Sequence, residues 1–153
     1  MNLITTPLNR LLLGSALLLS ISASSALAEQ KVADGRYEIH YNAFNSSFLT
    51  PEVAELNNIT RSKYRALVNV SVLKRGEDGS TTPVTAIVSG SAANLLGQAQ
   101  QMEFQKIDEG DALYYIGSFR FTEEERLKIS LEVQPDPDES PYNIEFEQTF
   151  YAD

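Results

Sequence analysis

The chain contains no cysteine and no tryptophan, and it has only one histidine, His40, and two methionines. Without cysteine no disulfide can form, so a folded core must rest on apolar packing alone. Structural zinc sites need several cysteine or histidine ligands, and copper(I) sites need several thioethers or imidazoles. One histidine does not supply such a set. We therefore expect no metal site and no other cofactor.

Positive charge is also scarce, since 12 Lys and Arg residues stand against 21 Asp and Glu residues, for a formal net charge of −9. Such a surface repels nucleic acid and anionic lipid. The sequence has neither a glycine-rich phosphate loop nor a strip of basic and aromatic residues. It therefore predicts no nucleic-acid partner and no membrane insertion of the processed chain.

The first 28 residues contain no acidic residue and differ chemically from the rest. Arg10 precedes an apolar run over residues 11–21, and small residues follow as far as Ala26-Leu27-Ala28, the pattern that signal peptidase reads. Serines interrupt the run before the roughly 20 apolar residues of a transmembrane helix are reached. We predict a signal peptide over residues 1–28, cleaved after Ala28, followed by a single exported β-sandwich domain over residues 29–153.

Alternation of apolar and polar residues with a period of two dominates residues 29–153, which indicates strands. Seven strands are expected, at about residues 37–42, 67–73, 84–91, 102–104, 112–121, 127–134 and 144–147. This pattern predicts an all-β fold, a seven-stranded immunoglobulin-like antiparallel sandwich, with a small barrel as the alternative. Residues 112–121 are apolar on both faces, which predicts a central strand that is covered on both sides.

The connection between residues 42 and 62 is longer than a hairpin loop. Within it, residues 50–56 are expected to form the one short helix of the domain. Thr50 suits the N-cap, Pro51 suits the first helical position, and Asn57 and Asn58 are expected to end the helix.

Several longer phrases occur together in this chain. They are HYNAFNSSFLTP (40–51), NVSV (69–72), SGSAANLLGQ (89–98), EGDALYYI (109–116) and QTFY (148–151). With these phrases the chain resembles an uncharacterised family of small exported proteins of Gram-negative bacteria, known as a domain of unknown function. The resemblance implies a periplasmic protein that consists of this domain and little else, and it supplies no catalytic or binding residues.

Few residues point to catalysis. Ser89-Gly90-Ser91 does not match a nucleophile elbow, and only His40 is available as a base. Residues 136–147 match half of a calcium-binding loop, but Pro141 occupies the position that needs glycine. We assign no catalytic residue and expect a protein that is not an enzyme. A hydrolase that uses paired carboxylates stays open as a further alternative, because the separation of acidic side chains cannot be read from the sequence.

Two expected loops carry more apolar residues than loops normally do. Phe44 and Phe48 lie in the first long connection, and Leu95 and Leu96 lie between the third and fourth expected strands. Such side chains either plug the open ends of a sandwich or form a binding patch on a rigid scaffold. If the strands before the two loops run in the same direction, both loops emerge at one end of the sandwich and form one exposed apolar cluster.

The leading hypothesis is therefore a non-catalytic immunoglobulin-like module that binds a protein or cell-envelope partner. The candidate partner-binding residues are Phe44, Asn45, Phe48, Asn94, Leu95, Leu96 and Gln98.

The alternative hypothesis is a small-ligand- or metal-binding protein with a pocket at one end of the sandwich. In that case His40, Tyr41 and Asn45 are the candidate polar contacts. The two hypotheses differ in whether the apolar loop residues project outward or line a concavity.

Overall fold

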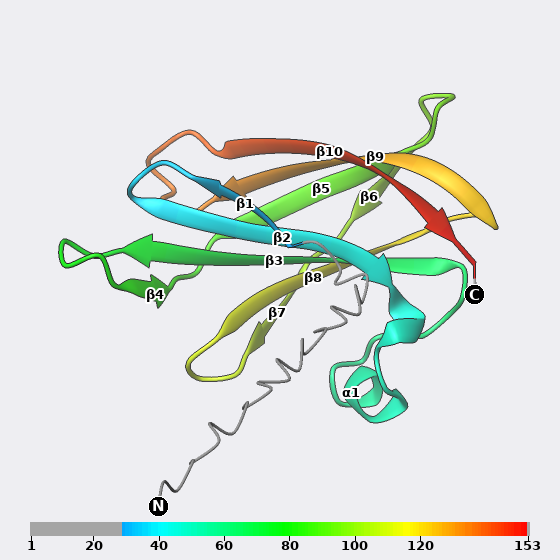
Figure 1. The fold of residues 1–153 in the computed structure, drawn as a ribbon, viewed down its shortest axis with the longest axis horizontal. Coiled ribbons are helices and arrows are strands. Elements are labelled where there is room, and N and C mark those ends of the chain that lie inside the picture. Colours follow the sequence, from blue (N-terminus) through cyan, green and yellow to red (C-terminus); the bar gives the residue numbers. More distant parts are fainter. Residues whose placement is uncertain (1–28, 153) are drawn as a thin grey trace, which may run out of the picture.

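The computed structural model describes residues 29–152, which form two antiparallel sheets packed face to face (Figure 1). The elements are β1 (Gln30–Ala33), β2 (Tyr37–Asn45), η1 (Ser46–Phe48), α1 (Pro51–Leu56), β3 (Arg65–Arg75), β4 (Thr81–Pro83), β5 (Ile87–Ala93), β6 (Ala99–Met102), β7 (Gln105–Asp108), β8 (Leu113–Arg120), β9 (Glu124–Gln134) and β10 (Tyr142–Tyr151). The predicted signal peptide lies outside the described residues. Within residues 29–152 no helix is long and apolar enough to cross a bilayer.

Sheet A has the strand order β1-β2-β3-β8-β7, with β4 paired to β3, and sheet B has the order β10-β9-β5-β6. The predicted antiparallel sandwich is thus confirmed. The alternating apolar residues of β3 and β9 face each other across the core, where Val68, Val70, Ile129 and Val133 are fully buried. Burial of these apolar side chains stabilises the fold, which has no disulfide bonds.

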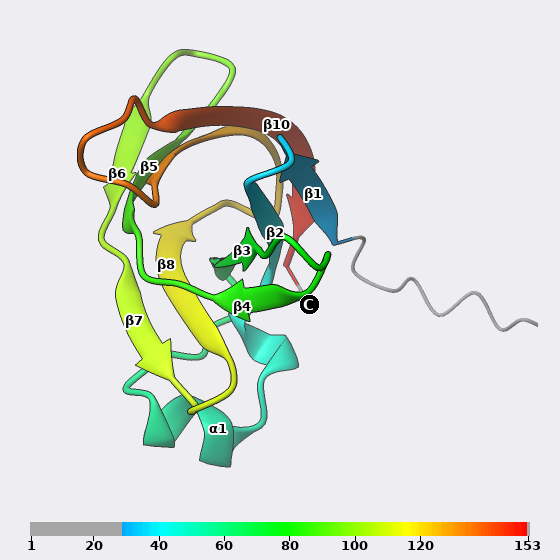
Figure 2. The same ribbon diagram turned by 90° about the vertical axis from the view of Figure 1, so that its left-hand side faces the viewer.

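Residues 29–152 form ten strands, whereas seven were predicted. The sequence pattern missed β1 and β4 because strands of four and three residues are too short to show alternation. The single strand expected at residues 102–104 is two strands, since the chain leaves sheet B after Met102 and enters sheet A at Gln105. Figure 2 shows β6 and β7 following one another down one side of the sandwich.

The short helix is confirmed as α1. The Thr50 hydroxyl accepts a hydrogen bond from the Val53 N–H, Pro51 opens the helix, and Asn57 is its C-cap. Asn58 follows with a left-handed backbone (φ 54°), which asparagine tolerates better than most residues. The helix and its flanking residues lie over part of the outer face of sheet A (Figure 2). Tyr114 and Ile116 on this face of β8 are half-buried, so the predicted covering of β8 is complete on its inner face and partial on its outer face.

Side-chain amides close both lateral edges of the sandwich. At one edge, the Gln100 side chain of β6 donates to the Arg120 carbonyl of β8 (2.7 Å) and accepts from the Arg120 N–H (2.9 Å). At the other edge, Asn45 of β2 donates to the Tyr151 carbonyl (2.7 Å), and Gln148 of β10 donates to the Ala43 carbonyl (3.1 Å). These bonds satisfy backbone groups that would otherwise remain unpaired at the sheet edges.

An ionic cluster joins the two sheets at the end of the sandwich away from α1. Asp34, in the β1–β2 turn, accepts hydrogen bonds from the backbone of Tyr37 and from the hydroxyl of Tyr142 in β10. Arg36 pairs with Glu139 in the β9–β10 loop (2.6 Å). The hydroxyl of Tyr142, helped by the backbone N–H groups, lowers the pKa of Asp34 from 3.8 to about 2.

This pKa shift predicts a local acid sensitivity. Because the folded-state pKa of Asp34 lies below its ordinary value, its ionised form stabilises the fold above about pH 4, and that stabilisation is lost as the pH falls toward 2. We expect the difference in free energy of unfolding between the wild type and Asp34→Asn to be largest near pH 6 and to shrink between about pH 4 and 2. Urea unfolding at several pH values measures it. A difference that stays constant over this range would contradict the assignment, and Tyr142→Phe should show a weaker version of the same dependence.

Candidate functional site

The long first connection, residues 46–62, is held at its base by buried hydrogen bonds. Ser46 is fully buried, and its hydroxyl donates to the Ser62 carbonyl (3.0 Å) and accepts from the Ser62 N–H (2.9 Å). The Arg61 guanidinium donates to the carbonyls of Ser47 and Leu49. The connection is therefore a closed loop with a fixed base, of the compact type that often carries function on protein surfaces.

Replacing Ser46 with Ala is expected to lower the free energy of unfolding by about 1–3 kcal/mol, because the Ser62 N–H loses its acceptor and the Ser62 carbonyl keeps only the Arg65 N–H as a donor. Chemical unfolding measures the loss, and amide exchange within residues 46–62 should accelerate more than elsewhere. Ser89→Ala, at an exposed strand position, is the matched control and should change stability little. An unchanged stability of Ser46→Ala would mean that the base of the loop is not held by this side chain.

The connection presents apolar side chains to solvent. Phe48 is 62% exposed, and Leu56 of α1 is 82% exposed. Phe44, half-buried on β2, lies between two hollows, one shared with Phe48 and Tyr151 and one beneath α1. Phe48 is thus an outward-facing side chain rather than a plug of the sandwich end.

The turn between β5 and β6 presents two further apolar side chains on a rigid support. The Asn94 side chain accepts hydrogen bonds from the N–H groups of Leu96 (3.1 Å) and Gln98 (2.9 Å) and donates to the Gln98 side chain (2.8 Å). Gly97 has a φ of 79°, a conformation that favours glycine. Leu95 and Leu96 project from this turn with 81% and 84% of their surface exposed. Asn94 and Gln98, which we expect to contact a partner, also bond to each other and fix the shape of the turn.

The predicted single cluster of the two loops is wrong. β2 and β5 do point to the same end of the sandwich, but β2 adjoins β10 at one lateral edge, whereas β6 adjoins β8 at the other. The two views of the ribbon place the β5–β6 turn and α1 on opposite sides (Figures 1 and 2). Strand direction fixes the end at which a loop emerges, but the order of strands in each sheet fixes the edge. The exposed side chains of Leu95 and Leu96 therefore lie apart from that of Phe48.

The three residues expected to line a ligand pocket do not come together. His40 faces outward and contacts Glu29 (2.5 Å) and Glu38 (3.3 Å), whereas Tyr41 is buried in the core with its ring against Phe146. Consecutive residues of a strand point to opposite faces, so His40 and Tyr41 cannot share a pocket. Asn45 is buried at the lateral edge, where it bonds Tyr151.

Neither metal nor paired-carboxylate chemistry has a formed site in the described part of the chain. No group of three potential metal-ligating side chains is assembled within residues 29–152. Two carboxylates, Glu132 and Glu145, line a depression of about 440 Å³ on the outer face of sheet B, but both are exposed to solvent. Catalytic acids and bases are usually held where water is excluded.

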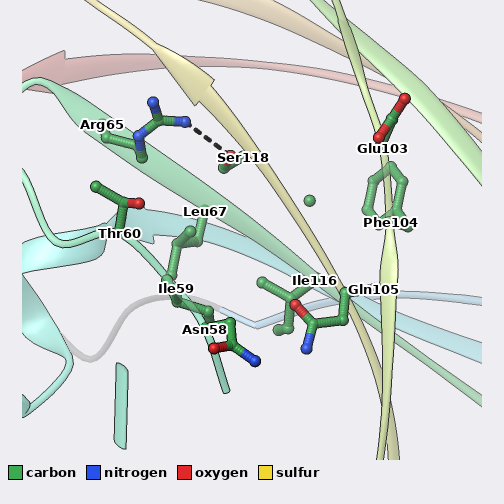
Figure 3. A pocket seen from close by; sticks show the side chains of 11 residues that line it. Asn58, Ile59, Thr60, Arg65, Leu67, Glu103, Phe104, Gln105, Ile116 and Ser118 are labelled. Atoms are coloured by element: carbon green, nitrogen blue, oxygen red, sulfur yellow. Dashed lines mark hydrogen bonds between the residues drawn. The ribbon is translucent and has the colours of Figure 1, made fainter. Parts of the chain in front are cut away.

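A hollow of about 310 Å³ lies on the outer side of sheet A between β3, β8 and the segment that follows α1 (Figure 3). Its polar side chains include Arg65, which donates to the Ser118 hydroxyl (3.0 Å), and Glu103, on the opposite side of the hollow. Its apolar lining residues are Ile59, Leu67, Phe104 and Ile116. Its volume is at the lower limit for a small-molecule pocket, and its lining is more polar than is usual for one.

A second hollow of about 180 Å³ lies beneath α1 and shares part of its lining with the first. Its walls are mostly apolar, with Phe44, Leu49, Val53, Ile107 and Tyr114 among them. The Gln105 side chain donates to the Asn57 carbonyl (3.0 Å) and so connects β7 to the segment after α1 beside both hollows. Sequence reasoning did not assign these residues. The available signal was Leu67, an apolar residue on the strand face opposite Val68 and Val70, next to the polar Asn69.

The family model for DUF4426, described as a domain of unknown function, matches residues 31–153. The chain belongs to the DUF4426 family. A crystal structure of a DUF4426 family protein from Pseudomonas aeruginosa PAO1 has 34% sequence identity and a TM-score of 0.70, covering 82% of this chain and 96% of that one. No curated protein matches this DUF4426 chain.

Two crystal structures of FetP from uropathogenic Escherichia coli strain F11 are more distant neighbours of the DUF4426 fold. A copper-bound single-residue variant of FetP has 13% identity and a TM-score of 0.56, covering 82% of this chain and 96% of that one. FetP as isolated after expression in the periplasm of E. coli has the same identity and TM-score, with coverage of 81% and 94%. At this identity the likeness shows the shared fold alone.

Proposed function

We propose that this DUF4426 protein is a non-catalytic periplasmic module that binds a protein partner through exposed apolar side chains at one end of its sandwich. The observation that carries the proposal is the β5–β6 turn. Asn94 holds its shape with three hydrogen bonds, and Leu95 and Leu96 are left more than four-fifths exposed. A rigid apolar projection loses little conformational entropy on binding, so it suits insertion into an apolar pocket of a partner.

The outward direction of these side chains favours a protein partner over a small ligand at the end of the sandwich. A small ligand needs a concave site that covers most of its surface. Leu95 and Leu96 project from the turn, and Phe48 is 62% exposed at the rim of a hollow. The acidic surface of the protein argues against an anionic membrane as the partner.

Site-specific crosslinking in the periplasm tests the proposal. A photoreactive phenylalanine analogue at position 95 or 96 should capture one protein repeatedly, and mass spectrometry would identify it. The same analogue at Thr82, an exposed position in β4, is the matched control and should capture little. Equal capture from positions 95 and 82 would contradict a binding role for the turn.

The periplasmic location rests on the predicted signal peptide and on the distant neighbour FetP, which was expressed in that compartment. We expect intact-mass measurement of the exported protein to give a chain that begins at Glu29, because Ala26-Leu27-Ala28 matches the signal peptidase pattern. A full-length chain retained in the membrane fraction would contradict both the cleavage and the location.

A further inference from the structure

A third hollow, the edge hollow, has a volume of about 190 Å³ and lies where the ends of β2 and η1 meet the end of β10 (Figure 1). Phe44 and Phe48 line it on one side, and Tyr151 of β10 lines it on the other. The amides of Asn45 and Gln148 hold these two edges of the sandwich together. Small-molecule pockets usually have volumes of about 300 Å³ or more, so the edge hollow is suited to a single side chain of a partner.

The three aromatic rings of the edge hollow do not stack on other rings. None of the aromatic pairs within residues 29–152 includes Phe44, Phe48 or Tyr151. Phe48 and Tyr151 are also more than half exposed to solvent. The face of an aromatic ring carries partial negative charge, so it attracts cations and packs against flat groups. These rings are therefore suited to contact a group that enters from outside.

The polar groups that line the edge hollow can accept hydrogen bonds. The Gln148 amide nitrogen donates to the Ala43 carbonyl (3.1 Å), so the amide oxygen points away from β2. Neither this oxygen nor the Thr149 hydroxyl has a hydrogen-bond partner within residues 29–152. An apolar side chain that covered both groups would take them out of water without replacing their hydrogen bonds, which costs free energy. The occupant should therefore bring N–H donors.

The charge of the chain favours a cation as the occupant. The lining of the edge hollow, taken over residues 29–152, contains no charged side chain. Beside the edge hollow, Glu124 of β9 is paired with Tyr151, so the two side chains lie on the same face of sheet B. The whole chain has a formal net charge of −9, and its field attracts cations and repels anions.

The cations of the chain itself are bound elsewhere. Arg126 of β9 is bound by Glu147 (2.9 Å), and Arg61 is bound by two backbone carbonyls of the first connection. The cation–ring contacts within residues 29–152 involve the rings of Tyr37 and Tyr64, and neither ring lines the edge hollow. The three rings of the edge hollow are therefore not covered by a cation of this chain.

We propose that the edge hollow binds an arginine side chain of a partner protein. A guanidinium is flat, so it stacks on an aromatic face, and its five N–H groups all donate in the plane of the group. In the edge hollow it stacks on the rings of Phe48 and Tyr151 and donates to the Gln148 oxygen and the Thr149 hydroxyl. This site is independent of the proposed function, because no residue of the β5–β6 turn lines it.

Three capped tripeptides that differ in one side chain test the proposal on the protein purified after export. The first is acetyl-Gly-Arg-Gly-amide. In the second, citrulline keeps the shape of arginine without its charge, and in the third, norleucine keeps only the apolar stem. NMR titration at low salt should shift the signals of Phe48, Gln148 and Tyr151. The arginine peptide should bind about tenfold more tightly than either neutral peptide, and this preference should shrink as salt is added.

Variants assign the effect to the edge hollow. Phe48→Leu and Tyr151→Leu keep an apolar side chain but remove a ring, and each should weaken binding of the arginine peptide about fivefold. Tyr64→Leu is the matched control, because Tyr64 is an exposed aromatic residue outside the edge hollow, and it should leave the affinity unchanged. Thr149→Val, which removes one acceptor at constant shape, should weaken binding about threefold. Glu124→Gln should reduce the dependence of the affinity on salt.

Three results would overturn the proposal. They are equal affinity for the arginine and citrulline peptides, unchanged affinity in both ring variants, and a loss in Tyr64→Leu as large as that in Phe48→Leu. Vesicles of phosphatidylethanolamine and phosphatidylcholine should not retain the protein, and retention that Phe48→Leu abolishes would assign the edge hollow to a lipid headgroup instead. Leu95→Ala should leave binding of the arginine peptide unchanged. The edge hollow and the β5–β6 turn can therefore fail or succeed independently.

Discussion

Replacing Phe119 with Ala should lower the free energy of unfolding by about 3–5 kcal/mol, the largest effect that we expect from a single side chain of this fold. Phe119 lies on β8 with 2% of its surface exposed, and its ring meets that of Phe150 from β10 edge to face, with centroids 5.1 Å apart. The two rings join the sheets at the end that carries the exposed loops. Urea unfolding monitored by tyrosine fluorescence and far-ultraviolet circular dichroism measures the loss.

Phe48→Ala is the matched control, because it makes the same chemical change at an exposed position. We expect it to change the free energy of unfolding by about 0.5 kcal/mol or less, as is usual for surface substitutions. A loss for Phe48→Ala as large as that for Phe119→Ala would mean that Phe48 is a plug of the sandwich, and the apolar surface of the first connection would then be structural.

Leu95→Ala should weaken binding of the captured partner by about 2 kcal/mol, or about 30-fold, while stability changes by about 0.5 kcal/mol or less. We expect the affinity to fall much more than the stability because Leu95 is exposed in the free protein. Its apolar surface is removed from water only when a partner covers it. Isothermal titration calorimetry with the partner gives the affinity, and thermal unfolding gives the stability.

Ile87→Ala provides the comparison for Leu95→Ala. Ile87 is also on β5 and is 59% exposed, but it lies at the opposite end of the strand from the turn. Its replacement should leave the affinity unchanged. A loss of affinity at Ile87 equal to that at Leu95 would indicate general apolar contact rather than recognition by the turn, and a large loss of stability at Leu95 would indicate packing that the fold does not show.

The elements that sequence reasoning predicted correctly are those with a strong local cause. Valines at alternate positions of 68–72 require a buried face, and the cap at Thr50 with Pro51 specifies the start of α1. The exposure of Leu95 and Leu96 was one of two open readings, because a sequence does not tell whether a loop folds inward.

The remaining features depend on contacts between distant parts of the chain. The split of residues 99–108 into strands of two sheets is set by the closing of one edge by Gln100 and Arg120. The separation of the two apolar loops follows from strand order, which no local pattern encodes. Likewise, the side-chain oxygen of Asn69 lacks a hydrogen-bond donor within residues 29–152 because of how distant segments pack around it, which is a property of the assembled fold.

The two ends of the sandwich differ in how they respond to their surroundings. At one end, the sheets are joined by Asp34, Arg36 and Glu139, whose attraction weakens in acid or in high salt. The end that carries the exposed loops is joined by the amides of Gln100, Asn45 and Gln148, which carry no charge and do not titrate. A drop in pH should therefore loosen the charged end first, while the leucines of the β5–β6 turn keep their position.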